Sequence, residues 1–461
     1  MYYFSVLLGS TIFGFGVVKI LPGPFRDLAT ISIKQLDTIL DQRSSDAEKD
    51  RVLVKNLLVL FSRLILFLFS LSICLAIGML PPTLVSYRQG LPVDSSSPFF
   101  FLLVTFGASL PILFIKKKSD YSYWSQLLHA LVLDNYNLNL YLYRRELRLH
   151  KINAEKLPEQ FVMVTGLARG GTTALTNLLF DENLFYSLNY GNMPFLMSPN
   201  LWKRFYRPKT SKSKERAHGD KLLFSNTSIE ALEEYFFKVL LNDCFIGERD
   251  MQTHDVGAEV YGSYLKYQQL FNSGESKRYL AKNNNFLLRY ESLRNCNKAF
   301  HTLLIFRNPI DHAHSLKKQN ENFEAQQRRD PFILQYMNWL GHHEFGLNHK
   351  VFDFGKEKTW RNFEKSSLNY WVCVWINYYQ HVLDLPVDEK LCLIDYSDLA
   401  SRPGELRSYL AKMLGMNYPV EELPAFNGNT YPEENRISLE EGLAQQAEQI
   451  FSQLKTRSIK L

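Results

Sequence analysis

The sequence predicts an α/β fold in which helices cover a mostly parallel central sheet, preceded by transmembrane helices near the N-terminus. Two observations predict it. After residue 157, compact runs of β-branched and apolar residues alternate with helical patterns, as in sheets whose strands are joined by helical crossovers. The first quarter of the chain instead holds long apolar runs with few charges. We expect a membrane region at residues 1–118, an amphipathic helical connector at 119–156 and a soluble α/β domain at 157–461.

Three apolar runs are candidates for membrane-spanning helices. Leu57–Leu80 has one charge, Arg63, and at about 1.5 Å per residue it can cross a hydrocarbon layer of about 30 Å. Pro98–Ile115 is uncharged and ends against Lys116–Lys118, a basic stop expected on the cytoplasmic side. Tyr2–Val18 is shorter and contains three glycines. We expect two or three spans, the alternative being that one of these runs is a buried core helix.

The basic residues around these runs predict the orientation. The loop at residues 81–97 holds only Arg88, whereas many basic residues lie between the first two runs. They include Arg26, Lys34, Arg43, Lys49, Arg51 and Lys55. We therefore expect an integral membrane protein with its N-terminus outside and its catalytic domain facing the cytoplasm.

Two further segments have amphipathic helical patterns. Thr30–Asn56 fits either a surface helix along the inner face of the bilayer or a solvated connector. Tyr121–Leu149 is expected to lead as one helix into the soluble region.

The net charge and the cysteine pattern indicate which binding partners and which redox environment to expect. The net charge is +6 over 461 residues and is not gathered into a tail, so nucleic acid is not an expected partner, whereas a lipid bilayer or an anionic small molecule is. The five cysteines show no C-x-x-C spacing. We expect them to be reduced and buried.

A phosphate-binding loop follows the first strand of the soluble region. Phe161–Thr165 is a compact β-branched run, Gly166–Thr173 is a glycine-rich turn, and Ala174–Phe180 has a helical pattern. In such a unit, backbone N–H groups and the helix N-terminus form a cradle for an anion. The alternative is a strand, turn and helix without a ligand.

The loop differs from the loop of nucleoside triphosphatases at one informative position. Gly166 and Gly171 have the spacing of that motif, but Thr172 stands where the motif has its lysine. The cation lies instead within the loop, as Arg169. This arrangement favours another phosphate-bearing donor over a nucleoside triphosphate.

A second strand leads into a second candidate phosphate site. His301–Phe306 is an apolar strand that ends at Arg307, and Ser315 lies eight residues later on the helix that follows Pro309. The guanidinium and the hydroxyl can converge on one phosphate. The alternative is a surface ion pair and an unrelated serine on the helix face.

Together, these two elements resemble the 5′-phosphosulfate loop and the 3′-phosphate site of sulfotransferases that use 3′-phosphoadenosine-5′-phosphosulfate (PAPS). The resemblance extends over residues 157–454 and is greatest to a bacterial branch of that family. It includes Tyr279–Tyr290, which carries Lys282, and the late strand and helix module from Leu393 to Gly415. One departure is Gly191-Asn192, where a charged pair is expected; Asn192 cannot act as a base.

The resemblance implies a P-loop-like three-layer fold, PAPS as co-substrate and no metal. The 5′-phosphosulfate is then held by Arg169, Gly170, Gly171, Thr172 and Thr173, and the 3′-phosphate by Arg307 and Ser315. Arg169 is also expected to act on the transferring group. The donor site should lie at the C-terminal ends of the parallel strands.

The transfer requires a base for the acceptor, and three residues are candidates. His218 is the first choice, because it lies in a loop bounded by glycine and aspartate, and Glu233 and Glu234 are the alternatives. Lys282 is expected to contact the donor sulfate or the acceptor. For His218 the competing interpretation is a structural hydrogen bond, and for Lys282 a solvated charge at a strand edge.

Two other polar or aromatic clusters have structural interpretations. His342-His343-Glu344, with His349 nearby, lacks the spacing of a metal motif, so we assign it to structure. The aromatic residues between Tyr370 and Tyr379 recur at helical spacing and predict a core helix.

The predicted function is therefore a membrane-anchored sulfotransferase that moves a sulfuryl group from PAPS to a hydroxyl or amine of an unidentified acceptor, with a lipid or saccharide favoured by the anchor. One alternative is a nucleotide-binding kinase or triphosphatase, disfavoured by Thr172. Another is a non-catalytic membrane scaffold with a degenerate nucleotide fold, disfavoured because both phosphate elements are retained. The acceptor and the oligomeric state are not readable from the sequence.

Overall fold

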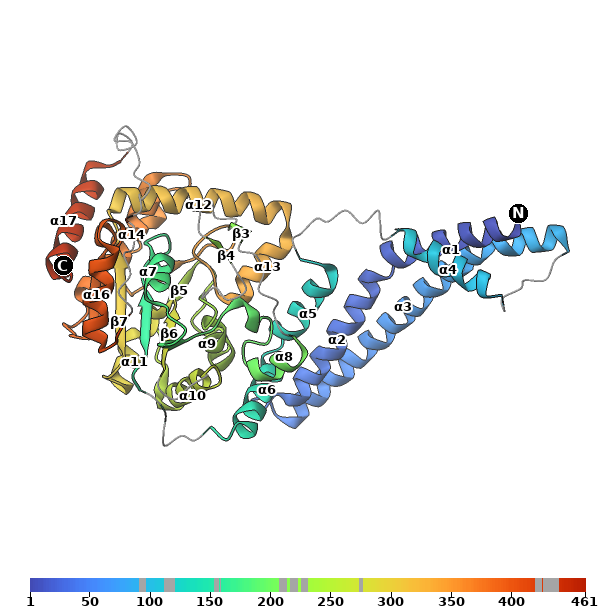
Figure 1. Cartoon of the computed structure of the whole chain (residues 1–461), viewed down its shortest axis with the longest axis horizontal. Helices are drawn as coiled ribbons and strands as arrows, with labels where there is room; N and C mark the ends of the chain where they lie inside the picture. Colours follow the sequence, from blue (N-terminus) through green and yellow to red (C-terminus); the bar gives the residue numbers. More distant parts are fainter. Residues whose placement is uncertain are drawn as a thin grey trace. The chain divides into compact units, whose positions relative to one another are not determined.

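The computed structural model describes residues 1–90, 97–111, 121–152, 157, 159–206, 214–215, 223–224, 231–272, 277–418, 425 and 439–461. The chain forms two compact units, residues 1–141 and 142–461. Both are drawn in Figure 1, the first in blue to cyan and the second from green to red.

The first unit is built from helices. They are α1 (Tyr2–Lys19), α2 (Pro22–Leu40), α3 (Asp46–Gln89), α4 (Pro98–Ser109) and α5 (Tyr123–Leu133), and the chain crosses into the second unit within α6 (Tyr136–Leu149). Two of the helices in the described part, α1 and α3, are long and apolar enough to cross a membrane. Many large apolar side chains of α3, such as Leu58, Phe61 and Phe69, are exposed, which suits a lipid-facing surface.

Small residues allow α1 to pack closely against α3 and α4. A Cβ added to Gly14 would lie 2.5 Å from the carbonyl oxygen of Ala108, and one added to Gly16 would lie 2.7 Å from the sulfur of Cys74. A Cβ on Gly107 would likewise lie 2.8 Å from Cβ of Ser10. Contacts between small residues of this kind are typical of helices packed within a bilayer. The glycines of the first apolar run therefore form a helix-packing face.

Three helix boundaries differ from the predicted ones. The segment Thr30–Asn56 is not one helix, because α2 ends at Leu40 and Ser45 begins α3 with a capping box to Glu48. The helix α3 continues through Pro81 to Gln89, so the predicted loop at 81–97 starts later; helices in apolar surroundings tolerate proline. Tyr121–Leu149 divides into α5 and α6. The end of the predicted run Pro98–Ile115, with Lys116–Lys118, lies outside the described residues.

The second unit confirms the predicted α/β fold. Its five-stranded sheet has the order β2-β6-β1-β7-β9, and every neighbouring pair is parallel. In that order the strands are β2 (Phe185–Tyr186), β6 (Arg278–Lys282), β1 (Val162–Thr165), β7 (His301–Phe306) and β9 (Leu391–Asp395). All residues of β1 and β7 are buried, as expected for central strands covered on both faces.

Helices cover the sheet on both faces (Figure 1). On one face, apolar residues of α7 (Thr172–Leu179) and α16 (Pro403–Leu414) share a core cluster with β1, β7 and β9. Against β7, α14 (Leu368–Asp384) is fixed by Tyr379, whose hydroxyl donates to the carbonyl of Ile305 at 3.0 Å. Trp371, Trp375, Tyr378 and Tyr379 are fully buried, which confirms the prediction of an aromatic core helix.

The remaining elements surround this sheet. Before β6 come η3 (Tyr190–Asn192), α8 (Pro199–Phe205), β3 (Lys214–Glu215), β4 (Leu223–Phe224), α9 (Glu234–Leu241), β5 (Asp250–Gln252) and α10 (Gly257–Gln269). After β6 come η4 (Phe286–Arg289), α11 (Tyr290–Cys296), α12 (Pro309–Arg329), α13 (Pro331–Leu340), β8 (Val351–Asp353), η5 (Thr359–Asn362), α15 (Tyr396–Ser401) and α17 (Glu441–Arg457). The strands β5 and β8 form a separate parallel pair.

All five cysteines are free thiols. Cys74, Cys373 and Cys392 are buried as predicted, but Cys244 and Cys296 are exposed. The prediction of five buried cysteines was therefore wrong for these two, because apolar neighbours in sequence do not decide whether a helix-end residue faces the core.

Candidate active site

The phosphate loop lies between β1 and α7, at the C-terminal edge of the sheet. Gly166 and Gly171 have φ angles of +151° and +105°, which favour glycine. A Cβ on Gly166 would lie 2.6 Å from the carbonyl oxygen of Ile305, and one on Gly171 would lie 2.7 Å from the ring of Tyr396. The loop therefore follows a path that side chains at these positions would block, with its backbone close to β7 and α15.

The structure brings the two predicted phosphate elements together. Arg169 lies in the loop with φ of +68°, and its Nε donates to Oγ of Ser315 on α12 at 3.3 Å. Ser315 is buried. Residues 146 positions apart in the chain thus meet at one point, as expected if both contact the same ligand.

Arg307 lies at the end of β7, beside this contact. It is only 8% exposed, and its guanidinium stacks on the ring of Tyr396 at 4.8 Å from the ring centroid. Asn308 caps α12 by accepting from the amides of Ile310 and Asp311, which fixes the turn between strand and helix. A cavity of about 410 Å³ opens beside Arg307, between α15 and α17.

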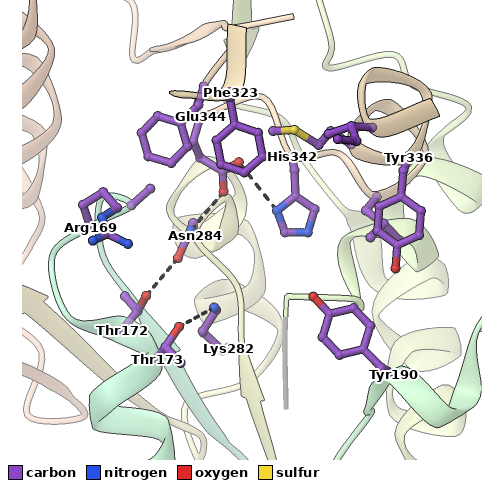
Figure 2. A pocket seen from close by; sticks show the side chains of 15 residues that line it. Arg169, Thr172, Thr173, Tyr190, Lys282, Asn284, Phe323, Tyr336, His342 and Glu344 are labelled. Carbon is purple, nitrogen blue, oxygen red and sulfur yellow. Dashed lines mark hydrogen bonds and ion pairs between the residues drawn. The ribbon is translucent and has the colours of Figure 1, made fainter. Parts of the chain in front are cut away.

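A second cavity, of about 210 Å³, opens beside the phosphate loop. Thr172, Thr173 and Lys282 line it, and Nζ of Lys282 donates to the hydroxyl of Thr173 at 2.8 Å (Figure 2). Lys282 is 5% exposed, so the alternative prediction, a solvated charge at the strand edge, is wrong. A buried ammonium group needs compensating polar partners.

A chain of polar contacts continues along the cavity wall from the loop. The hydroxyl of Thr172 contacts Oδ1 of Asn284 at 3.4 Å, and Nδ2 of Asn284 donates to Oε1 of Glu344 at 2.9 Å. The other carboxylate oxygen of Glu344, Oε2, lies 3.6 Å from Nδ1 of His342. Figure 2 shows Thr172, Asn284, Glu344 and His342 one after another around the cavity.

Glu344 is held as a carboxylate in this position. Its side chain is 7% exposed, and burial alone would raise its pKa, but the adjacent His342 and the amide of Asn284 lower that pKa to about 2. His342 is half-buried, with its side chain 24% exposed.

His342 and Glu344 differ from their predicted role. The sequence predicts a structural role for both, together with His343, but His342 and Glu344 line the cavity. They lie two residues apart in the irregular segment that follows α13, which ends at Gly341, and both reach the cavity. That spacing after a terminating glycine was the available signal.

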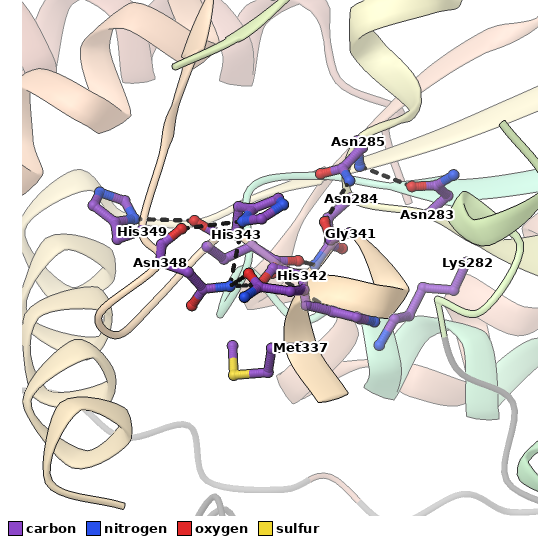
Figure 3. Close-up of polar contacts among 12 residues, drawn as sticks. Lys282, Asn283, Asn284, Asn285, Met337, Gly341, His342, His343, Asn348 and His349 are labelled. Carbon is purple, nitrogen blue, oxygen red and sulfur yellow. Dashed lines mark hydrogen bonds and ion pairs between the residues drawn. The ribbon is translucent and has the colours of Figure 1, made fainter. Parts of the chain in front are cut away.

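The neighbouring histidines have the predicted structural role. His343 contacts the carbonyl of Asn348 at 3.1 Å, and His349 contacts the carbonyl of His343 at 3.2 Å (Figure 3). His349 also contacts the hydroxyl of Tyr370 at 3.0 Å. Both are buried, and burial lowers the pKa of His343 to about 4 and that of His349 to about 3. They remain neutral near pH 7. Within the described part of the chain, no group of three histidine, cysteine or acidic residues is arranged to hold a metal ion.

The two predicted carboxylate bases are not among the residues that line the cavity. Glu234 forms a two-pronged ion pair with Arg289, at 2.7 and 2.6 Å, and both side chains are fully buried. Burial favours its neutral form, but the Arg289 charge outweighs burial and lowers the pKa of Glu234. We therefore do not retain Glu234 as a base.

Glu233 is the centre of a buried hydrogen-bond network. Its carboxylate accepts from the hydroxyls of Tyr264 at 2.8 Å and Tyr279 at 3.0 Å, and from the amide of Asn283 at 3.3 Å. Burial raises its pKa to about 7. With its acceptor sites satisfied by framework residues, Glu233 joins α9, α10 and β6 and has no side facing the cavity, so it is not retained as a base either.

His218, the first-choice base, lies outside the described residues, as do Arg216, Gly219 and Asp220. The backbone strands β3 and β4 on either side of it pair in antiparallel fashion. At the departure from the resembled pattern, Asn192 has a structural role: its Oδ1 accepts from the amide of Asn189 at 2.9 Å.

The chain is similar to several solved structures at low sequence identity. No protein-family model matches the chain, and no curated protein matches it. Solved bacterial sulfotransferases resemble it in structure. The sulfotransferase STF9 of Mycobacterium avium has a TM-score of 0.40 at 13% identity, over 82% of this chain and 96% of its own. STF1 of Mycobacterium tuberculosis H37Rv has a TM-score of 0.39 at 12% identity, over 72% and 87%. A sulfotransferase of Alicyclobacillus acidocaldarius has a TM-score of 0.32 at 16% identity, over 65% and 93%.

Proposed function

We propose that the chain is a membrane-anchored sulfotransferase that moves a sulfuryl group from PAPS to a hydroxyl or amine. The observation that carries the proposal is the contact between Arg169 and Ser315, which joins the glycine loop and the strand-end site of Arg307 into one donor site. A nucleoside triphosphate offers one chain of phosphates, whereas PAPS carries phosphate groups at two ends of one ribose. Two adjoining cationic sites match the second ligand.

The residues present fit such a ligand. Glycine at 166 and 171 lets the loop follow this path into the N-terminus of α7, and a helix N-terminus of this kind presents backbone N–H groups to an anion. Together with the hydroxyls of Thr172 and Thr173 they would hold the 5′-phosphosulfate. Arg307, buried against Tyr396, and Ser315 would hold the 3′-phosphate.

Transfer is an in-line displacement at sulfur, so charge develops on the departing phosphate oxygen. Lys282 and Arg169 are the cations beside the loop that would stabilise this charge. Because Lys282 already contacts the hydroxyl of Thr173, it is positioned before the donor binds.

We propose that the catalytic unit faces the cytoplasm, where a soluble nucleotide donor is accessible. The proposal rests on the excess of lysine and arginine between the first two apolar runs and on the basic stop at Lys116–Lys118. The apolar helices α1 and α3 support an anchor by their length and composition.

Nucleotide binding to the full chain in detergent tests the proposal. Calorimetry should find that 3′-phosphoadenosine 5′-phosphate binds more tightly than ATP, because only the former fills both sites. Equal affinity, or tighter binding of ATP, would contradict the sulfotransferase assignment and favour a kinase or triphosphatase. Transfer of radiolabelled sulfate from PAPS to a membrane extract then tests catalysis.

A further inference from the structure

The cavity beside the loop has two chemically different walls. The loop side carries Arg169, Lys282 and the two threonines. The opposite side is apolar and comes from the end of α12, from α13 and from the segment that follows it: Phe323, Ile333, Tyr336, Met337, Leu340 and Phe345. The cations lie where the donor would bind, so the apolar wall remains for the other substrate.

One polar pair stands at the boundary between these walls. Figure 2 shows His342 with one ring nitrogen toward Glu344 and the other turned toward the part of the cavity where Lys282 and Tyr190 lie. The carboxylate of Glu344 faces Nδ1 at 3.6 Å, so it favours the tautomer with the proton on Nδ1. Nε2 then carries a free electron pair directed into the cavity.

The carboxylate is itself fixed in place. Asn284 donates to Glu344 at 2.9 Å and is linked through Thr172 to the phosphate loop. The site therefore has the parts of a general-base arrangement: a base, a carboxylate that orients it and a polar link to the donor loop. The 3.6 Å between Oε2 of Glu344 and Nδ1 of His342 is longer than a hydrogen bond, and catalytic contacts are often long before substrate binds and shorten in the complex.

We propose that His342, oriented by Glu344, is the general base of the transfer reaction, and that the acceptor is an alcohol whose apolar body packs against α13. The proposal rests on the proposed sulfotransferase function. It replaces Glu233 and Glu234, which are enclosed in the framework, and competes with His218.

Nε2 of His342 takes the proton from the acceptor hydroxyl while that oxygen forms a bond to sulfur. The bond between sulfur and the bridging phosphate oxygen breaks, and its electron pair stays on the phosphate of 3′-phosphoadenosine 5′-phosphate. The products are a sulfate ester and the nucleotide, and the proton on His342 passes to solvent. Glu344 remains ionised throughout.

Turnover of the full chain in detergent tests the base. His342→Ala should lower the rate of sulfate transfer from PAPS about 10²- to 10⁴-fold, and added imidazole should restore part of it. Affinity for 3′-phosphoadenosine 5′-phosphate and the unfolding midpoint should stay within twofold and a few degrees of the wild type. His150→Ala, at an exposed position, is the matched control and should behave as wild type. Undiminished turnover in His342→Ala, or a loss that appears in His218→Ala instead, overturns the assignment.

The isosteric variant Glu344→Gln tests the orienting role. Gln keeps the size of the Glu344 side chain but not its charge, so the imidazolium that forms when His342 takes the proton is less stabilised and the maximal rate should fall. The KM for the acceptor and the affinity for 3′-phosphoadenosine 5′-phosphate should stay within twofold of the wild type. Added imidazole replaces a missing base but not a missing carboxylate, so it should restore turnover in His342→Ala and not in Glu344→Gln. An unchanged maximal rate in Glu344→Gln, or its rescue by imidazole, overturns the pairing.

Two alcohols test the acceptor class. With 4-phenylbutanol and methyl β-glucoside as probes, transfer should occur to the first and be at least tenfold slower to the second. Ile333→Lys and Met337→Lys, which place a charge on the apolar wall, should raise the KM for 4-phenylbutanol without changing nucleotide affinity. Preference for the glucoside, or transfer to neither probe, overturns the acceptor class. Failure of nucleotide binding in the wild type would instead overturn the proposed function itself.

Discussion

Removing the Arg307 guanidinium should separate the two halves of the donor site. Arg307→Ala deletes a charged group that is 8% exposed and held over the ring of Tyr396 at 4.8 Å, so little ordering is needed before it binds a phosphate. Hydrogen bonds to charged groups contribute about 1.5–3 kcal/mol. At about 1.4 kcal/mol per tenfold change, the Kd for 3′-phosphoadenosine 5′-phosphate should rise roughly 12- to 140-fold.

The assay is calorimetry on the full chain with two nucleotides. Adenosine 5′-phosphosulfate lacks the 3′-phosphate, so its affinity should change by less than twofold in the same variant. Arg328→Ala, at an exposed position near the end of α12, the helix that follows Arg307, is the control for loss of a positive charge and should leave both affinities unchanged. Unchanged affinity for 3′-phosphoadenosine 5′-phosphate in folded Arg307→Ala would refute the assignment of this site.

Two further predictions concern the framework and the membrane. Burial raises the pKa of Glu233 to about 7 from 4.5, so its contribution to stability is full below about pH 4.5 and is lost as pH rises through about 7. Urea unfolding measured from pH 5 to 8 should therefore show that the wild type loses this stability and that Glu233→Gln does not. Glu233→Gln should also keep its turnover. Abolished turnover in this variant would make Glu233 a candidate base again. A reporter fused after Lys118 should be cytoplasmic and one near Val93 external, and the reverse pattern would contradict the orientation.

Local sequence was sufficient to locate the glycine loop and the strand end that we propose as the donor site. Gly166 and Gly171 need φ angles that side chains disfavour, and the strands before the loop and before Arg307 are continuous apolar runs, so both phosphate elements could be located from short stretches of chain. Patterns of this kind are local, because backbone conformation and strand burial depend on neighbouring residues.

Local sequence was misleading where chemistry depends on what surrounds a side chain. Glu233 and Glu234 have the right chemistry for a base, but only the packing of α9, α10 and β6 encloses them among tyrosines and Arg289. His342 and Glu344 belong to a histidine-rich segment that resembles a structural cluster. Their place on the cavity wall follows from where α13 ends relative to β6.

The sequence by itself determined the apolar helices, the parallel sheet and the two phosphate elements, because periodicity, glycine conformation and strand burial are properties of adjacent residues. Tertiary structure decided that Arg169 meets Ser315, that Lys282 is buried against Thr173, and that Asn284 carries the polar chain on to Glu344. These residues are 60 to 146 positions apart, and their contacts arise only when parallel strands place their C-terminal ends along one edge of the sheet.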